Sequence, residues 1–517
     1  MYGQRVLVAG LLLTACAQAP AQQANVQPAG TVSAQDLDAA VQSITPQDFF
    51  ARIGFLASDA LGGRDTPSPG LEAAAAYIAS EFHRYGLRPA GDAGSFIQRW
   101  PYTTRAMDVA GVRFDVTAGG AARSLTYRSD FYAQPGARGS FDGGLVFVGS
   151  AITAASVRGN ALRNRAVLLY HAEAPSAQDL ARLRAAADSA GAGAIVIALG
   201  ATADAAAIAR AAQAAERPRG VGAVPVFFLR NDRARELFGA AGLDFAALTA
   251  AGATPAPTQL TGATATLGAG MIETVHQVPN VVGILEGSDP VLRNTYLIYS
   301  AHIDHVGSGC RGTSAADQVC NGADDDASGT SAVLEMAEAF ATLPVRPRRS
   351  IIFLGVSGEE KGLLGSRHYA DNPTVPIESL IANINMDMVG RDPHPDTVSA
   401  LGQAYSSLGP LVQRLNSEHP ELRLTVADDM WPGQNLFFRS DHFHFLRREV
   451  PALFFFTGLH DDYHAASDHV ENIDLDKITR VTRLVFRLGH AIANDTNAPQ
   501  WDPAGLEEVR RLTTQGR

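Results

Sequence analysis

Three aspartates stand side by side in this chain: Asp324, Asp325 and Asp326, within the stretch 321–329. Carboxylates at contact distance repel one another and raise one another's pKa, and a cation placed among them removes that cost. The stretch lies between a predicted strand and a predicted helix, so the acids gather at a helix N-terminus, where negative charge is favoured. Taken alone, the triplet is also typical of a solvated acidic loop, so the choice depends on the motifs around it.

Three further motifs place chemically capable side chains directly after predicted strands. His302 and Asp304 are two residues apart on an extended segment and point the same way. His302 can therefore bind a metal while Asp304 accepts a hydrogen bond from its other ring nitrogen. Glu359 and Glu360 are adjacent and project to different sides, which suits one metal ligand and one general base. Asp387 lies between apolar residues, and a buried carboxylate needs a partner.

More histidines surround the fourth predicted strand, and spacing alone does not choose the ligand among them: His442, His444, His460, His464 and His469. Together the motifs supply at least two histidines and three carboxylates, with a glutamate to spare and without sulfur. Such ligands suit zinc, with manganese or cobalt as substitutes. Five ligand residues exceed the three that one catalytic zinc takes from a protein, and they fit two ions ~4 Å apart that share a bridging carboxylate.

The elements that must position these residues alternate between strand and helix from residue 279 onward. Strands are predicted at 295–300, 350–356, 380–385 and 452–456. The alternation indicates an α/β sheet with helices on both faces, and sites in such sheets form at the carboxyl ends of the strands. The helix after the aspartate triplet is predicted to be amphipathic, with Val333, Met336 and Phe340 among the residues of its apolar face.

Composition divides the chain into further segments. Residues 44–106 are predicted to be the N-terminal helical part of the catalytic domain, whose main part is residues 276–495. Residues 107–260 carry short β-type runs without clustered acids, and they are predicted to form an insert domain without evident chemistry of its own. Residues 496–517 are predicted to be a tail with a short closing helix.

The N-terminus is typical of an exported protein. Residues 1–15 combine Arg5 with a short apolar run, as a signal peptide does. The sequence ending at Cys16 resembles the lipobox of bacterial lipoproteins, which implies cleavage before Cys16 and a lipid anchor on it; the alternative is cleavage after Ala19 or Ala21. Residues 16–43 are predicted to be a flexible tether. We expect a periplasm-facing lipoprotein of the bacterial cell envelope, or a secreted protein if Cys16 is not lipidated.

Charge and cysteine content narrow the partners. The 517 residues carry a formal net charge of −11, which argues against nucleic acid, because phosphate neutralisation needs a basic face. After the leader no long uncharged apolar run predicts a spanning helix, so a membrane is expected only through the lipid. Cys310 and Cys320 are most simply a disulfide in an exported protein; the competing interpretation is a pair of thiolate metal ligands. Oligomeric state is not predicted.

The order of these motifs resembles the two-zinc exopeptidase family of bacterial leucyl aminopeptidase, plasma glutamate carboxypeptidase and glutamate carboxypeptidase II. The resemblance implies a central mixed, mostly parallel sheet, and it likens residues 107–260 to a protease-associated domain. It makes Asp325 the bridging carboxylate. One Zn²⁺ would take His302, Asp325 and Asp387, the other Asp325, Glu360 and His464. It further makes Glu359 the general base and Asp304 the support of His302, and it places Ser440–His442 beside the site.

The function that this resemblance implies is removal of N-terminal residues from peptides, with a metal-bridging water as nucleophile and Glu359 as base. One departure is that Phe437 stands where the leucyl aminopeptidase type has a tyrosine that helps to bind the tetrahedral intermediate. A carboxypeptidase or dipeptidase is the nearest alternative and would need a basic residue, such as Arg391 or Arg439, for the terminal carboxylate. The full two-zinc set argues against a one-zinc glutaminyl cyclase, and a metal-free binding protein is a more remote alternative.

Overall fold

A computed structural model describes residues 32–154, 157–203, 222–250, 258–391 and 394–515. The predicted leader and Cys16 lie outside these residues. The chain divides into two compact units: a first unit made of the segments up to Trp100 and from Val278, and a second unit, Pro101–Gln277. Among the described residues, no helix has both the length and the hydropathy needed to cross a membrane.

The first unit is built on a mixed sheet. Its strand order is β1 (Arg88–Pro89), β11 (Met271–Leu285), β13 (Ser350–Val356), β12 (Tyr296–His302), β14 (Leu380–Met386), β17 (Ala452–Phe456), β15 (Thr397–Leu401) and β16 (Thr425–Ala427). The central strands β13, β12, β14 and β17 are parallel to one another, whereas β11 and β15 pair antiparallel at the two sides. The predicted α/β fold class is confirmed.

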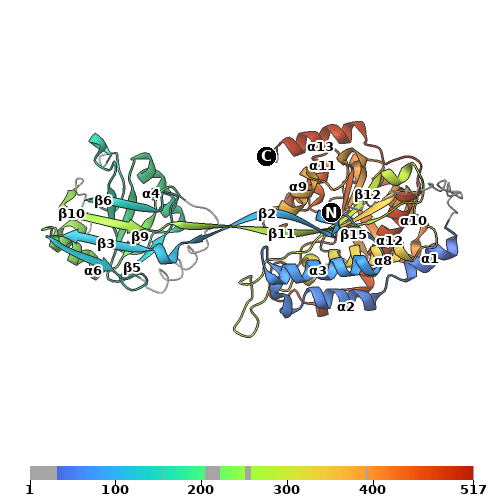
Figure 1. Cartoon of the computed structure of the whole chain (residues 1–517), viewed down its shortest axis with the longest axis horizontal. Coiled ribbons are helices and arrows are strands. Elements are labelled where there is room, and N and C mark those ends of the chain that lie inside the picture. The colour runs from blue at the N-terminus through green and yellow to red at the C-terminus, as the bar shows by residue number, and fades with distance from the viewer. Residues whose placement is uncertain (1–31, 155–156, 204–221, 251–257, 392–393, 516–517) are drawn as a thin grey trace, which may run out of the picture. The chain divides into compact units, whose positions relative to one another are not determined.

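Helices cover both faces of this sheet, because its central strands are apolar on both sides. Leu297 and Tyr299 of β12 pack into one core, and Ile298 packs into the other. The helices of the first unit are α1 (Ala34–Gln42), α2 (Pro46–Leu56), α3 (Pro69–Arg84), α8 (Gly329–Thr342), α9 (Leu364–Asp371), α10 (Leu408–Glu418), α11 (His442–Leu446), α12 (Leu475–Asn494) and α13 (Pro503–Gln515). Figure 1 shows α2, α3 and α8 on one side of the sheet, with α9 and α11 on the other.

One helix differs from its prediction. The sequence predicted an amphipathic helix after the aspartate triplet, but α8 is buried on almost every side from Gly329 to Phe340. The reason is that α8 contacts strands β12, β13 and β14 and is covered in turn by helices α2 and α12. Its N-terminus, where the acids lie, is therefore held rigidly against the sheet.

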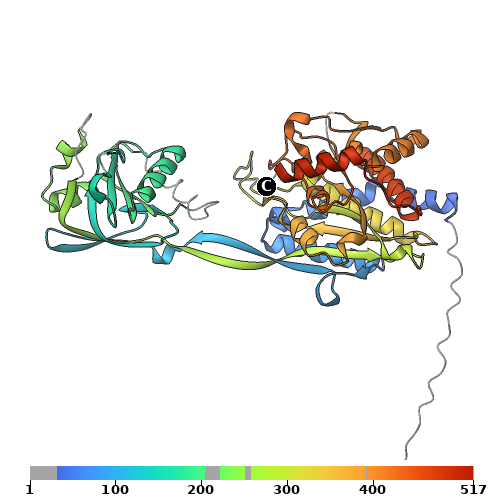
Figure 2. The ribbon, with the colours of Figure 1, turned by 90° about the horizontal axis from the view of Figure 1, so that it is seen from above.

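The second unit has its own sheet and its own cores. Its strand order is β4 (Ala121–Leu125), β3 (Arg113–Ala118), β10 (Thr258–Gly268), β6 (Ser140–Phe147), β7 (Ala166–His171), β8 (Ala194–Leu199), β9 (Val226–Leu229) and β5 (Phe131–Gln134). Val167 of β7 faces a core shared with α4 (Ala177–Ser189), and Leu168 faces one shared with α6 (Asn231–Ala240) and α7 (Phe245–Thr249). Strand β2 (Ile97–Met107) pairs with β11, and both strands pass from one unit to the other side by side (Figure 2).

Candidate metal centre

The parallel strands of the first unit bring the predicted ligands to one edge of the sheet. His302 is the last residue of β12, and Asp387 follows the last residue of β14. Glu359 and Glu360 follow β13, and Asp325 lies in the loop before α8. Because parallel strands end at the same edge, side chains that are far apart in sequence meet there.

Three of these side chains form the first ligand group. The Nε2 atom of His302 lies 3.2 Å from Oδ1 of Asp325 and 3.5 Å from Oδ1 of Asp387. All three residues are buried. They form a histidine–carboxylate group of the kind that can hold one metal ion.

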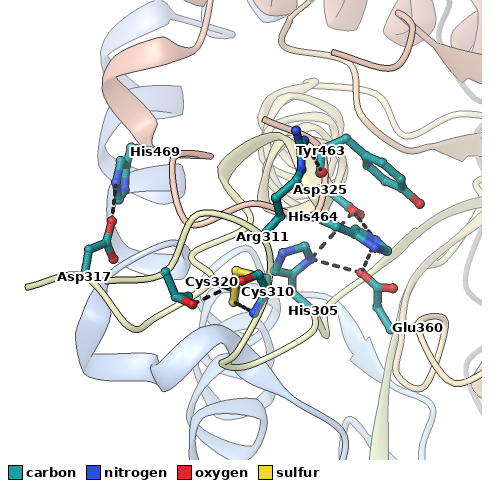
Figure 3. Close-up of a disulfide and its surroundings, with 11 residues drawn as sticks. His305, Cys310, Arg311, Asp317, Cys320, Asp325, Glu360, Tyr463, His464 and His469 are labelled. Atoms are coloured by element: carbon teal, nitrogen blue, oxygen red, sulfur yellow. Dashed lines mark hydrogen bonds and ion pairs between the residues drawn. A yellow bond between two sulfur atoms is a disulfide. The ribbon is translucent and has the colours of Figure 1, made fainter. Parts of the chain in front are cut away.

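A second ligand group lies on the other oxygen of Asp325. The Nε2 atom of His464 is 3.1 Å from Oδ2 of Asp325 and 3.1 Å from Oε1 of Glu360 (Figure 3). Asp325 thus presents one carboxylate oxygen to each group, as a bridging ligand must. The five predicted ligand residues are all brought together, and the placement of each is compatible with its predicted partition between two ions.

The donor set fits zinc on its chemistry and on its unsatisfied atoms. Within the described part of the chain, Oδ2 of Asp325 and Oε1 of Glu360 are buried and accept no hydrogen bond. Buried polar atoms are ordinarily paired, so these two oxygens need another partner. Burial raises the pKa of the Glu359 carboxyl well above its ordinary value, and neighbouring carboxylates add to that rise. A cation among imidazole nitrogens and carboxylate oxygens satisfies these atoms and removes the repulsion.

The three aspartates of the triplet have different contacts. Only Asp325 faces both ligand groups. The Asp326 carboxylate accepts the backbone N–H groups of His302 at 3.1 Å, Gly329 at 2.9 Å and Met388 at 3.2 Å, so it ties the ligand loops together. Asp324 instead accepts from the N–H of Gly390, at 2.7 Å. Two of the three acids are therefore structural braces.

The sequence prediction for Asp304 needs a correction in its geometry. The Nδ1 atom of His302 contacts the backbone oxygen of Asp304 at 3.1 Å, while the Asp304 carboxylate is 3.9 Å away. That carboxylate accepts instead from the Thr66 hydroxyl, at 2.8 Å, and from the N–H of Glu359, at 3.2 Å. The main chain of Asp304 thus orients the histidine, and its side chain orients the glutamate.

Ser440 supports the first group from outside. Its hydroxyl donates to Oδ2 of Asp387 at 2.7 Å and accepts from the side-chain amide of Asn385, also at 2.7 Å. Such an outer hydrogen bond fixes the orientation of a ligating carboxylate. Ser440, which the resemblance places beside the site, therefore acts on it through Asp387.

The structure places the histidines that spacing left open in different surroundings. His460 lies 3.2 Å from Asp324, and His469 lies 3.5 Å from Asp317. His442 stacks on Phe454, and burial lowers its pKa to about 3. His464 is the member of this set that reaches Asp325 and Glu360.

A pocket opens beside the ligand groups, and sequence reasoning missed most of its wall. Its polar end consists of His302, Asp325, Glu359 and Asp387, with Arg439 and Tyr463 also lining it. The remaining wall is apolar and consists of Met388, Leu436, Phe454, Phe456 and Leu459. These residues come from three separate segments, so no local pattern in the sequence marks them as one surface. Phe437, considered above for the tyrosine position, does not line this pocket.

Fold and site together define an α/β protein with a candidate two-metal centre at the carboxyl ends of its parallel strands. Residues 280–489 match the model of Peptidase family M28. The matched region carries every predicted ligand residue.

Individual relatives agree over shorter stretches. A probable zinc metalloprotease of Pyrenophora teres f. teres (strain 0-1) is 36% identical over 170 residues, which are 31% of this chain and 33% of that protein. Leucine aminopeptidase 2 of Arthroderma otae is 28% identical over 229 residues, 40% of this chain and 42% of its own. The matches thus span about a third or less of the first curated relatives.

Solved structures with a similar course of the chain include an aminopeptidase from Aneurinibacillus sp. strain AM-1. It is 20% identical, with a TM-score of 0.49, and the match covers 90% of this chain and 98% of that one. A zinc aminopeptidase from Bacillus subtilis is 17% identical, with a TM-score of 0.47 and coverage of 88% and 97%.

Proposed function

We propose that this protein is an exported, two-zinc aminopeptidase that removes an apolar N-terminal residue from peptides. The observation that carries the proposal is the pocket described above. It places an apolar wall of Met388, Leu436, Phe454 and Phe456 beside the carboxylates of the ligand groups. When the apolar side chain of a substrate residue packs against this wall, the peptide bond next to that residue lies at the polar end of the pocket.

The chain's own residues supply binding and proton transfer. When bound, two zinc ions held by the two ligand groups would lower the pKa of a water and polarise the scissile carbonyl. Glu359 lies at the polar end of the pocket, and its backbone N–H is held by Asp304. From there its carboxylate takes the proton of the attacking water and delivers it to the departing amine. The carboxylates that surround the site favour a free, protonated α-amino group.

The carboxypeptidase alternative has one observation in its favour. Arg439 lines the pocket, with Nη2 3.4 Å from the hydroxyl of Tyr463, and an arginine there could bind a terminal carboxylate. Arg391, the other candidate, is engaged at 2.6 Å by Asp462. The aminopeptidase proposal is preferred because the carboxylates at the polar end outnumber this one cation.

The test combines metal analysis with a substrate panel on the same preparation. We expect two zinc ions per chain, cleavage of leucyl and phenylalanyl anilides, and no cleavage of their N-acetylated forms. The Glu359→Gln variant should retain both ions and lose turnover by several orders of magnitude. Two ions with cleavage only of substrates that have a free C-terminus would replace the proposal by the carboxypeptidase alternative. Near-normal turnover in Glu359→Gln would remove Glu359 from its proposed role.

The surroundings of the enzyme also belong to this proposal. The leader-like residues 1–15 and Cys16 support a lipid-anchored, periplasm-facing protein. Globomycin treatment of expressing cells should leave an uncleaved precursor if Cys16 is lipidated, and a Cys16→Ser variant should then be released from membranes.

The second unit is proposed to be a protease-associated domain that limits substrate size. A variant without residues 107–260 should then gain activity on long peptides relative to dipeptide anilides.

A further inference from the structure

One histidine at the candidate centre has no role in the scheme above. His305 lies three residues beyond His302, after the end of β12, and is fully buried. Among the described residues, neither of its ring nitrogens has a hydrogen-bond partner. A buried imidazole without partners is costly, so its position needs an explanation.

The ring points at the second ligand group. Its Nδ1 atom lies 3.0 Å from Oε1 of Glu360 and 3.7 Å from Oδ2 of Asp325. Those are the two oxygens that His464 approaches at 3.1 Å from its own side. Figure 3 shows the four side chains pointing toward one another. The two histidines therefore approach the same pair of carboxylate oxygens, and His305, Asp325 and Glu360 lie close enough together to hold a metal ion.

The spacing of these atoms is that of ligands around one ion. With metal–ligand bonds of about 2.0–2.1 Å, neighbouring ligand atoms in a tetrahedral zinc site lie ~3.4 Å apart. The four measured separations, from 3.0 to 3.7 Å, scatter around that value. A direct hydrogen bond between His305 and Glu360 would explain the shortest one. The experiment below separates that explanation from ligation.

The backbone holds the ring in this place. A Cβ atom on Gly322 would lie 2.6 Å from the ring of His305, so the ring packs directly on the main chain of the aspartate loop. The N–H of His305 donates to the backbone oxygen of Arg64 at 3.3 Å. His305 is thus fixed against the loop that carries Asp325, and this preorganisation favours ligation.

We propose that His305 is a fourth protein ligand of the second ion, alongside Asp325, Glu360 and His464. The two ions then differ in kind. The ion at His302, Asp325 and Asp387 has three protein ligands and open positions, as catalytic zinc does, whereas the ion at His305 has four and is the more firmly held. This inference rests on the proposed two-zinc site but not on the choice of substrate.

The test follows zinc release rather than activity. The purified protein is loaded with zinc and titrated with a chromogenic chelator, and the metal that remains is measured by elemental analysis. We expect the wild type to release one ion readily and the other at much higher chelator concentration. In His305→Ala the retained ion should weaken by more than about 100-fold, beyond the 10–100-fold typical of an outer-shell change. Asp387→Asn should weaken the readily released ion instead.

A matched control and a second readout separate ligation from packing. His490→Ala removes a half-buried histidine of the first unit whose Nε2 has no hydrogen-bond partner among the described residues, and it should leave both release steps unchanged. In the cobalt-substituted protein, His305→Ala should change the visible absorption bands of the retained ion. A loss below about 100-fold with unchanged bands would assign His305 a mere hydrogen bond and overturn the inference. A wild type that binds no zinc would overturn the proposed function itself.

Discussion

Replacing Arg64 by methionine should strongly destabilise the protein, although Arg64 lies outside the predicted site. Its side chain is fully buried and donates to four backbone carbonyls. These are the oxygens of Ile303 at 3.0 Å, Asn321 at 2.7 Å, Gly322 at 3.0 Å and Leu56. One guanidinium therefore joins the end of α2, the His302 loop and the aspartate loop.

The expected loss of stability follows from the four backbone carbonyls that lose their hydrogen-bond donor. Methionine preserves most of the volume but donates nothing, so four buried carbonyls lose a charged donor. At about 1 kcal/mol for each unsatisfied carbonyl, the lower end of the usual range, the loss is ~4 kcal/mol. Burial lowers the pKa of the Arg64 guanidinium, which shows that burying this charge is itself unfavourable. Removing the charge offsets part of the loss, which is why we use the lower end of the range.

The assay is urea unfolding of the zinc-loaded protein, with release of zinc to a chelator as a second readout. Arg64→Met should lose ~4 kcal/mol of unfolding free energy and should release zinc more readily while still folded. The control is Arg414→Met on α10, whose exposed i,i+4 pair with Glu418 is worth ~0.5 kcal/mol or less. If Arg64→Met unfolds within ~1 kcal/mol of the wild type, the accounting of buried carbonyls is refuted.

Three further changes have calculable outcomes. Replacing Cys310 and Cys320 together by serine opens a disulfide of sequence separation 10, which should cost ~2.5–3 kcal/mol in urea unfolding and abolish any further effect of reductant. Burial and the nearby charge of Arg487 lower the pKa of His490 to about 4. Stability should therefore fall as pH drops from 6.5 toward 4, by up to ~3 kcal/mol, and His490→Gln should flatten that pH dependence. Leu459→Trp narrows the apolar part of the pocket, so the ratio of kcat/KM for leucyl over alanyl anilides should fall at least ~10-fold. An unchanged ratio would show that this wall does not bind the substrate side chain.

The sequence predicted the fold because the central strands are apolar on both faces and end abruptly in polar residues. The strands predicted at 350–356 and 452–456 agree with β13 and β17 at both ends. The strand predicted at 295–300 runs on to His302 in β12, since pairing with β13 continues there. Local patterns could not show that α8 is covered on its outer side, because that burial depends on helices α2 and α12.

The sequence predicted those site residues that lie at or just after the carboxyl end of a strand. His302, Glu360 and Asp387 share that position, and the strand order then makes them neighbours. What sequence could not supply are contacts set by distant segments. The choice of His464 depends on its reach to Asp325, and the role of Arg64 depends on carbonyls up to 258 residues away. His305 was visible beside Asp304, but only its packing against the aspartate loop turns it toward Glu360.

The arrangement explains why three aspartates can stand together without losing the fold. Asp324 and Asp326 accept backbone N–H groups, and these fixed dipoles offset part of the cost of burying their carboxylates. Burial still raises the pKa of Asp326 well above its ordinary value, and Oδ2 of Asp324 lies 3.2 Å from His460. Asp325 depends on its histidines and on a cation: burial raises its pKa, but the neighbouring imidazoles of His302 and His464 outweigh burial and hold its pKa well below the ordinary value. Asp324 and Asp326 hold the loop in place through their hydrogen bonds, and the Asp325 carboxylate between them is left free to bridge two ions.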